Sequence, residues 1–443
     1  MNIFKISFSK KKGTKANRLS IKRFLKIVGP GVITGAADDD PSGIATYSQT
    51  GAQYGFGLLW TALFMLPMMY VVQEMSARIG IVTGKGISKN IKIYYSKYIL
   101  YLIVSLLVIA NVINLGTDLG AMASATQLII PLDFNFLVII FTVIILILEI
   151  FVPYKNYSKI LKWLTLSLFA YIFTGLIIHI DWIEVIKFSI IPNIQFNVGF
   201  LFLIVGVLGT TISPYMMFWQ ANQETEEEMK LHLLSKKEGI PHISMKYLGK
   251  MRIDTALGML FSEIATWFII VTTAATLNKN GITNMQSASQ AAQALQPLVN
   301  SFPYAGEIAK ILFALGIVGT GLLAVPIFSG GASYAICEIF DFKEGLSFSF
   351  KKARIFYLVI LASTLVGLSI NFLGINPIKA LVYTAIINGF ISVPLIGMLL
   401  LITNNKRIMG TYTNKRFTNL IGFITFSVMG LSAIAAIFSF FNQ

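Results

Sequence analysis

The stretch GAADDDPSGIATYSQ, Gly35 to Gln49, places three consecutive aspartates and a proline inside a largely apolar segment. Pro41 has no backbone N–H to donate, and it disfavours helical dihedral angles at Asp40, the residue before it. Gly43 tolerates dihedral angles that other residues avoid. The stretch therefore predicts a helix that is broken at its middle, with acids at the break.

The composition indicates that this helix lies in a membrane. The chain has 443 residues, of which 55% are hydrophobic and 12% are charged, whereas soluble proteins carry about 25% charged residues. Apolar runs long enough to span a bilayer recur along the whole sequence. The longest polar stretch, about 220–252, is too short for a separate soluble domain. We therefore expect an all-α polytopic membrane protein.

Hydropathy predicts about eleven transmembrane helices. A basic cytoplasmic tail, 1–25, precedes a single transmembrane domain, 26–443. The expected spans are 26–53, 58–79, 99–130, 136–152, 159–180, 196–219, 255–277, 306–336, 354–373, 378–403 and 417–440.

The distribution of basic residues predicts the orientation. With the N-terminus inside, the outer loops hold four lysines, and the other 31 of the 35 Lys and Arg lie in the tail, in inner loops or at inner helix ends. The four are Lys187, Lys279, Lys310 and Lys379. This asymmetry follows the positive-inside rule and accounts for the net charge of +15 without nucleic acid as a partner. We expect a multi-pass protein of the plasma membrane, with a bacterial cell membrane as its setting and its C-terminus outside. The oligomeric state stays open.

A second interrupted span follows five spans after the first. The stretch GTTISPY, Gly209 to Tyr215, breaks the sixth span at Pro214. Because an odd number of spans reverses the direction of the chain, the two breaks predict inverted repeats of about 26–180 and 196–403, with an extra helix at about 417–440. Paired broken helices of this kind mark the binding site of a transporter near the bilayer midplane.

Oxygen atoms dominate both breaks. Asp40 offers a carboxylate, and Thr210, Thr211 and Ser213 offer hydroxyls. An acid within a membrane span is usually functional, so we interpret Asp40 as a ligand of a cation. Asp38 and Asp39 have two open interpretations: they line the site, or they cap a half-helix.

Four stretches together resemble the Nramp family of divalent metal transporters. They are DPSG (Asp40–Gly43), QEMSARIGIVTGKG (Gln73–Gly86), GTDLGAM (Gly116–Met122) and TTISPY (Thr210–Tyr215). No single stretch is specific, but their order and spacing cover nearly the whole chain. The resemblance implies a LeuT-like 5+5 inverted repeat with broken helices 1 and 6. It also implies a metal site formed by Asp40, Gly43, Thr210 and Ser213.

The departures from the family pattern change the expected metal. Gly43 stands where the family has an asparagine ligand, Ser213 where it has methionine, and Thr210 where it has alanine. Soft ligands favour softer transition metals, whereas oxygen ligands suit Mg²⁺, Ca²⁺ and Mn²⁺. The pattern is similar to that of the Nramp-related magnesium transporter branch, which implies Mg²⁺ and Mn²⁺ as substrates. The smaller side chains would leave room for a partly hydrated ion.

Two further departures concern protons. Tyr215 and Ala121 replace the histidine and glutamate of the family's proton pathway, although Asp118 remains. We therefore expect transport without proton coupling.

Several polar residues are candidates for the cavity around the site. Asp118 lines the cavity or pairs with a base such as Arg354. Glu263 lines the cavity or is a buried hydrogen-bond partner, and Asn388 completes the site or satisfies a helix kink. The full set of cavity candidates is Asp39, Asp118, Thr211, Tyr215, Glu263 and Asn388.

Other charged groups have structural interpretations. Glu74 and Arg78 are four residues apart, which predicts an ion pair on one helix face. The acidic stretch ETEEEMK, Glu224 to Lys230, is expected to be a solvated helix start. The three histidines lack the spacing of zinc ligands.

The expected function is that of a secondary transporter for Mn²⁺ or Mg²⁺ that works by alternating access and needs no cofactor. The alternative within the same fold is a sodium-coupled symporter for organic solutes. Symporters of that kind bind the anionic carboxylate of a solute at half-helix N-termini. The Asp40 carboxylate at the break would repel such a group, which argues against this alternative. An intramembrane enzyme is less favoured, because no nucleophile stands with a base.

Overall fold

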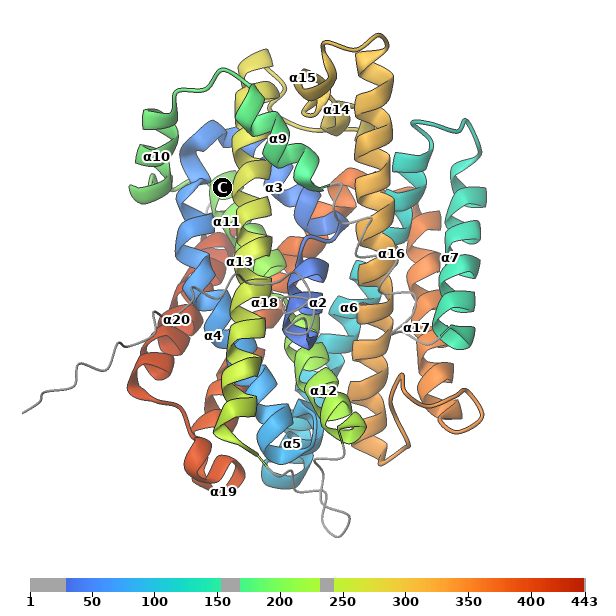
Figure 1. Cartoon of the computed structure of the whole chain (residues 1–443), viewed down its shortest axis with the longest axis vertical. Coiled ribbons are helices and arrows are strands. Elements are labelled where there is room, and N and C mark those ends of the chain that lie inside the picture. The colour runs from blue at the N-terminus through green and yellow to red at the C-terminus, as the bar shows by residue number, and fades with distance from the viewer. Residues whose placement is uncertain (1–28, 153–167, 232–242, 442–443) are drawn as a thin grey trace, which may run out of the picture.

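The computed structural model describes residues 29–152, 168–231 and 243–441. All elements in these ranges are helices, and most run along the long axis of the molecule (Figure 1). The long helices are α4 (Trp60–Thr83), α6 (Lys97–Thr126), α7 (Phe134–Phe151), α13 (Met245–Thr276), α16 (Ala305–Phe340), α17 (Arg354–Ile370), α18 (Pro377–Asn404) and α20 (Arg416–Phe441).

Both predicted breaks are present. The first span consists of α2 (Pro30–Asp38) and α3 (Pro41–Tyr54), so the break falls at residues 39 and 40. The other broken span consists of α11 (Val198–Thr211) and α12 (Pro214–Lys230), with the break at residues 212 and 213. In both cases the second half begins at a proline, which lacks the backbone N–H that a helix interior uses and is well suited to the first turn.

Most of the predicted spans correspond to long apolar helices. Among the described residues, eight helical segments are long and apolar enough to cross a membrane, and a ninth follows if α3 and α4, which meet at 108°, are one bent span. The other half of the first broken span, α2, has nine residues and is too short to cross a membrane alone. The predicted span 159–180 begins outside the described residues, and the structure shows only α9 (Phe169–Ile177) from it. The count of eleven stays a prediction.

Loops and short helices gather at the two ends of the molecule in the order that alternating spans require. The lower end in Figure 1 holds α5 (Ile87–Tyr94), α19 (Lys406–Met409) and the segment 341–353. The upper end holds α10 (Trp182–Ile190), α14 (Ala288–Gln293) and α15 (Gln296–Val299). The lower end carries the predicted inner loops and the upper end the predicted outer loops.

The first half-helix is held by α13. A Cβ atom on Gly258 of α13 would lie 2.2 Å from the carbonyl oxygen of Gly31, so the two backbones touch at this point. The carboxylate of Asp254, also on α13, accepts hydrogen bonds from the backbone N–H groups of Gly29 and Gly31, each at 2.7 Å. These N–H groups have no partner within their own helix. A distant residue therefore caps α2 and fixes its position.

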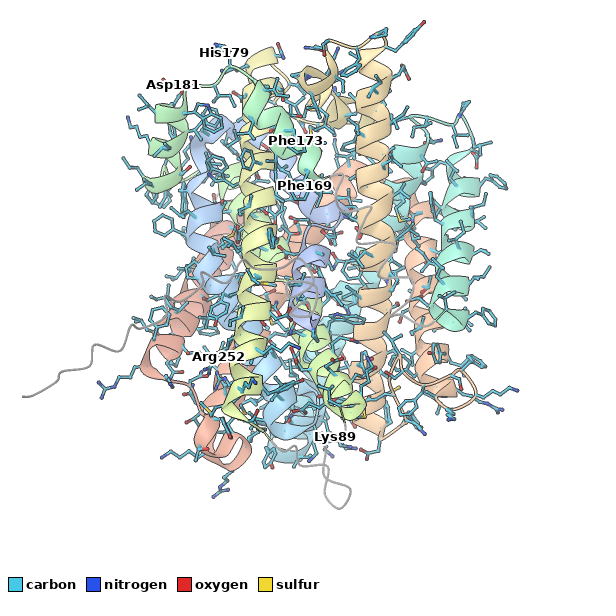
Figure 2. The ribbon with its side chains drawn as sticks, viewed as in Figure 1. Lys89, Phe169, Phe173, His179, Asp181 and Arg252 are labelled. Atoms are coloured by element: carbon cyan, nitrogen blue, oxygen red, sulfur yellow. The ribbon has the colours of Figure 1, made fainter. Side chains whose placement is uncertain are left out.

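An ion-pair network closes the lower end. Glu74 pairs with Arg78 at 3.0 Å, as predicted, and also with Arg252 of α13 at 2.9 Å. Arg78 donates further to the carbonyl of Tyr412 and to Asn414, in the segment between α19 and α20. Figure 2 shows Arg252 and Lys89 at this end and Asp181 at the opposite one.

Candidate metal site at the two helix breaks

The two breaks lie side by side in the interior. α3 packs against α11, and α2 packs against α12. Asp40, Gly43, Thr210 and Ser213, the four predicted metal ligands, are all buried. The structure thus brings together residues that are about 170 positions apart in the sequence, as the two-break model requires.

Asp40 has a defined orientation at the start of α3. Its Oδ1 accepts a hydrogen bond from the backbone N–H of Gly43 at 2.6 Å, as an N-cap aspartate does. The hydroxyl of Ser42 lies 2.9 and 3.0 Å from the two carboxylate oxygens. Each carboxylate oxygen has two lone-pair sites, so the capping bonds leave Asp40 with acceptor capacity toward the break. The capping and ligand roles are compatible.

Oxygen atoms of three kinds surround Gly43. A Cβ atom built on this glycine would lie 3.1 Å from the carbonyl of Asp38, 3.2 Å from Oδ1 of Asp40 and 3.3 Å from Oγ1 of Thr210. The Ser42 and Thr210 hydroxyls are 3.5 Å apart, which links α3 to the end of α11. Carboxylate, carbonyl and hydroxyl oxygens are the donors that hard cations prefer.

Ser213 is the N-cap residue of α12. It is fully buried, yet its hydroxyl makes no capping bond to the first turn of that helix. A serine at this position usually bonds to a backbone N–H. The Ser213 hydroxyl is therefore not committed to the helix, and it stays a candidate ligand.

Thr211 and Tyr215 have structural partners. Thr211 shares a hydrogen bond of 2.8 Å with the hydroxyl of Tyr47, which joins α11 to α3. The Tyr215 hydroxyl donates to the carbonyl of Ala37 at 3.2 Å. Tyr215 thus holds a carbonyl at the last turn of α2.

Asp118 and Asn388, both fully buried, differ in their surroundings. Neither oxygen of Asp118 has a hydrogen-bond partner in the described part of the chain, so the pairing with a base such as Arg354 is not formed there. Asp118 interacts electrostatically with Asp40. Asn388 instead exchanges two hydrogen bonds with Asn114 of α6, at 2.9 and 3.0 Å. Its amide braces α18 against α6.

The remaining cavity candidates are Asp39, which lies next to α13, and Glu263, which belongs to that helix. Glu263 is 4% exposed and interacts electrostatically with Asp39. Within the described ranges, no three His, Cys, Asp or Glu side chains are grouped closely enough to hold a metal ion by themselves. A cation at the breaks would depend on Asp40 together with neutral oxygen ligands and water.

The sequence did not single out three residues that support the site. Two of them lie on α3. The hydroxyl of Ser42 hydrogen-bonds to the Asp40 carboxylate, and the hydroxyl of Tyr47 hydrogen-bonds to that of Thr211. Ser392 of α18 donates to the carbonyl of Ile212, inside the second break, at 2.7 Å. The only sequence signal for them is a hydroxyl in an apolar helix, which in most cases bonds to its own helix backbone.

The acidic stretch at the end of α12 is not solvated, contrary to the prediction. Glu224, Glu226 and Glu228 are buried. Glu226 accepts hydrogen bonds from the hydroxyls of Tyr334 and Ser347, and from the backbone N–H of Leu346 at 2.7 Å. The acids face inward because α12 ends against α16 and the segment 341–353, which the local sequence does not reveal.

Two groups in the segment between α16 and α17 have shifted pKa values. Hydrogen bonds from Lys89 and Lys92 lower the pKa of the exposed Asp341 carboxyl to about 2. Burial, followed by repulsion from Glu338, raises the pKa of Glu344 to about 10. Lys89, Glu338 and Glu344 line a pocket of about 180 Å³ beside α5.

Two facing helix breaks that run in opposite directions, with a buried acid between them, define an inverted-repeat membrane transporter. A family model described as natural resistance-associated macrophage protein-like matches residues 31–439. The chain belongs to this family, Nramp.

Relatives and solved structures agree with this assignment. The chain is 26% identical over 420 residues to the divalent metal cation transporter MntH of Caldanaerobacter subterraneus subsp. tengcongensis, covering 92% of each chain. It is 25% identical over 425 residues to MntH of Klebsiella pneumoniae (strain 342), covering 94% of each. Both relatives are named as transporters and not as enzymes.

Structural comparison confirms the fold class. The manganese transporter of Eremococcus coleocola superposes with a TM-score of 0.73 at 16% identity, over 98% of this chain and 91% of that one. MhsT, solved with L-phenylalanine, gives a TM-score of 0.60 at 12% identity, over 97% and 100%. The fold is therefore that of Nramp and LeuT-like proteins. The predicted domain and repeat boundaries remain predictions.

Proposed function

We propose that this protein carries divalent metal cations across the membrane by alternating access. The observation that carries the proposal is the Asp40 carboxylate, buried between two helix breaks and accompanied by the Asp38 carbonyl and the Thr210 hydroxyl. The names of the MntH relatives support the same substrate class. The C-terminal ends of α2 and α11 point their partial negative charge toward the breaks, which favours a cation there.

The substrates we propose are Mg²⁺ and Mn²⁺, as in the Nramp-related magnesium branch. Ser213 and Gly43 remove the soft and amide ligands of the family pattern and leave oxygen atoms alone at the breaks. Mg²⁺ keeps several of its waters and binds through one or two carboxylates. A single carboxylate with hydroxyl and carbonyl neighbours suits that mode of binding.

We further propose that transport is not coupled to protons. Tyr215 is engaged with the Ala37 carbonyl and acts as a brace. Tyrosine, with an ordinary pKa of about 10, releases no proton near neutral pH. Ala121 has no titratable group, which leaves Asp118 alone on α6 near the site. The membrane potential would then drive entry, with about 4.6 kcal/mol per divalent ion at 100 mV.

Uptake into proteoliposomes tests the substrate assignment. Wild-type protein is expected to take up Mn²⁺ and Mg²⁺, with Ca²⁺ a poorer substrate and organic solutes not carried. Asp40→Ala should abolish metal uptake, whereas Asp181→Asn, in the exposed N-cap of α10, should not. Metal uptake by Asp40→Ala at the wild-type rate would contradict the assignment of the site. Uptake of an organic solute by the wild type would support the symporter alternative.

Internal pH during metal influx at fixed potential tests the absence of coupling. We expect metal to enter without acidification. Metal-dependent acidification that disappears in Asp118→Asn would establish proton coupling through Asp118 instead.

A further inference from the structure

The aspartates at the first helix break face two different helices, α11 and α13. Asp40 faces α11 through Ser42 and Thr210. Asp38 faces α13, because the hydroxyl of Ser262 donates to its Oδ2. The neighbours of Asp39 are likewise Ser262 and Thr266 of α13. The side chains of Asp38 and Asp39 are therefore not extra ligands of the Asp40 site, although the Asp38 carbonyl faces it.

Glu263 adds a third carboxylate on the α13 side. It precedes Thr266 by three residues, which places the two side chains on neighbouring positions of one helix face. Glu263 is 4% exposed, and neither of its oxygens has a hydrogen-bond partner in the described ranges. Its charge acts on Asp38 and on Asp39. One oxygen of each of these aspartates also lacks a partner among the described residues.

No basic side chain compensates this cluster in the described part of the chain. None of the ion pairs found there includes Asp38, Asp39 or Glu263. The charges that act on them are those of one another and of Asp40. Buried like charges without a counter-charge are strongly unfavourable. A cation bound between these unpartnered carboxylate oxygens would relieve the repulsion.

We propose that Asp38, Asp39 and Glu263, with the hydroxyls of Ser262 and Thr266, bind a second cation, and that this ion is hard and monovalent, with Na⁺ as the probe. The site lies on the α13 side of the break and is separate from the proposed divalent site at Asp40. Its ligands are carboxylate and hydroxyl oxygens, which are hard donors.

The arrangement of the ligands favours a monovalent ion over a divalent one. Within the described residues, the three carboxylates are not grouped closely enough to hold a metal ion by themselves, so an ion here would depend on the Ser262 and Thr266 hydroxyls and on water as well. Mg²⁺ demands near-ideal octahedral geometry. Unwound backbone beside a half-helix end is the setting in which transporters of this fold class coordinate Na⁺. An ion here would neutralise charge beside the break and so stabilise the packing of α2 on α13.

Thermal unfolding of the purified full-length protein tests the proposal. Unfolding temperature is measured in divalent-free buffer while Na⁺ replaces choline at constant ionic strength. A ligand that binds only the folded state raises the unfolding temperature, so we expect a saturable rise of a few degrees. Asp40→Ala should retain the rise, which separates this test from that of the proposed function.

The decisive variant is Glu263→Gln, which should lose the Na⁺-dependent rise. The matched control is Glu149→Gln, on α7, which makes the same change at a buried glutamate that bonds to Ser329, and it should retain the rise. Thr266→Ala, a milder change, should move the midpoint to higher Na⁺ concentration, and it decides the matter if Glu263→Gln does not fold.

Three results would overturn the proposal. They are the absence of a Na⁺-dependent rise in the wild type, a full rise in Glu263→Gln, and an unchanged midpoint in Thr266→Ala. A rise that depends on Glu263 but is produced by Mn²⁺ and not by Na⁺ would also overturn it, in favour of a second divalent site.

Discussion

At the scale of residues, a few groups at the site each have more than one role. Asp40 caps α3 through Gly43 and keeps acceptor capacity for a cation. Gly43 has no side chain, so three oxygens approach one another around it. The sequence predicted Asp40, Thr210 and Ser213 as ligands because they place oxygen atoms at a proline break, and acids are rare in membrane spans. It could not identify Ser392 or Tyr47, because their roles depend on which helix lies opposite.

The preference among metals should depend on residue 213. Replacing Ser213 by methionine adds a soft thioether, which binds softer ions. Ser213→Met should therefore shift uptake toward Mn²⁺, Fe²⁺ or Cd²⁺ and weaken Mg²⁺, as measured by competition in proteoliposomes. Ser369→Met, at the exposed end of α17, serves as the control. An unchanged ranking in Ser213→Met, or a wild type that excludes Mg²⁺, would contradict the hard-site proposal.

The Ile212 carbonyl in the second break should need Ser392 as its hydrogen-bond donor. Its hydroxyl is the donor to the Ile212 carbonyl, and a buried acceptor left without a partner costs about 1–3 kcal/mol. Ser392→Ala should lower the free energy of unfolding by that amount. Ser369→Ala removes a hydroxyl that bonds within its own helix and should change stability little. Equal effects of the two variants would show that the Ile212 carbonyl is satisfied in another way.

At the scale of elements, the sequence predicted the two breaks to within a residue or two but not the short helices at the ends. Proline after an acid or a serine is a strong local signal for a break. By contrast, α5, α10, α14 and α15 are too short for a clear hydrophobic period and depend on tertiary packing. The buried acids of α12 were misinterpreted for the same reason, because Tyr334 and Ser347, which bond to Glu226, come from distant segments.

The contact of α2 with α13 should tolerate no side chain at residue 258. A Cβ atom there would meet the Gly31 carbonyl at 2.2 Å, and overpacking of this kind costs about 1–3 kcal/mol. Gly258→Ala should therefore destabilise the protein. Gly249→Ala lies on the same helix with open space around it, and alanine is the better helix former, so it should be neutral or stabilising by up to about 1 kcal/mol. Chemical denaturation in detergent compares the two, and equal stability would contradict the close approach.

At the scale of the whole molecule, the site lies buried among the described residues. The four proposed ligands are buried, and the cavity above them, between α3, α16 and α18, is about 10 Å³, room for about one water. At the lower end, Glu74 and Glu226 tie α4 and α12 to distant segments. Alternating access would require these lower contacts to open, and their long sequence separation explains why the sequence showed only the local pair Glu74–Arg78.

The lower end should also make stability depend on pH. The pKa of Glu344 is about 10 in the folded protein, well above its ordinary value of about 4.3. The folded state then binds this proton more tightly than the unfolded state, so stability should fall as pH rises between those two values. Glu344→Gln should flatten the decline in unfolding temperature between about pH 5 and 9. Glu307→Gln, at the other end, should keep the wild-type slope, and a wild-type slope in Glu344→Gln would contradict the assignment.

Locating bound Mn²⁺ by anomalous X-ray diffraction tests the central claim most directly. The account predicts an anomalous peak between the two breaks, in contact with the Asp40 carboxylate directly or through one water, beside Thr210 and the Asp38 carbonyl. The peak should be absent in Asp40→Ala crystals soaked in the same way. A peak elsewhere in the wild type, or an unchanged peak in Asp40→Ala, would contradict the claim that Asp40 at the paired breaks binds the metal.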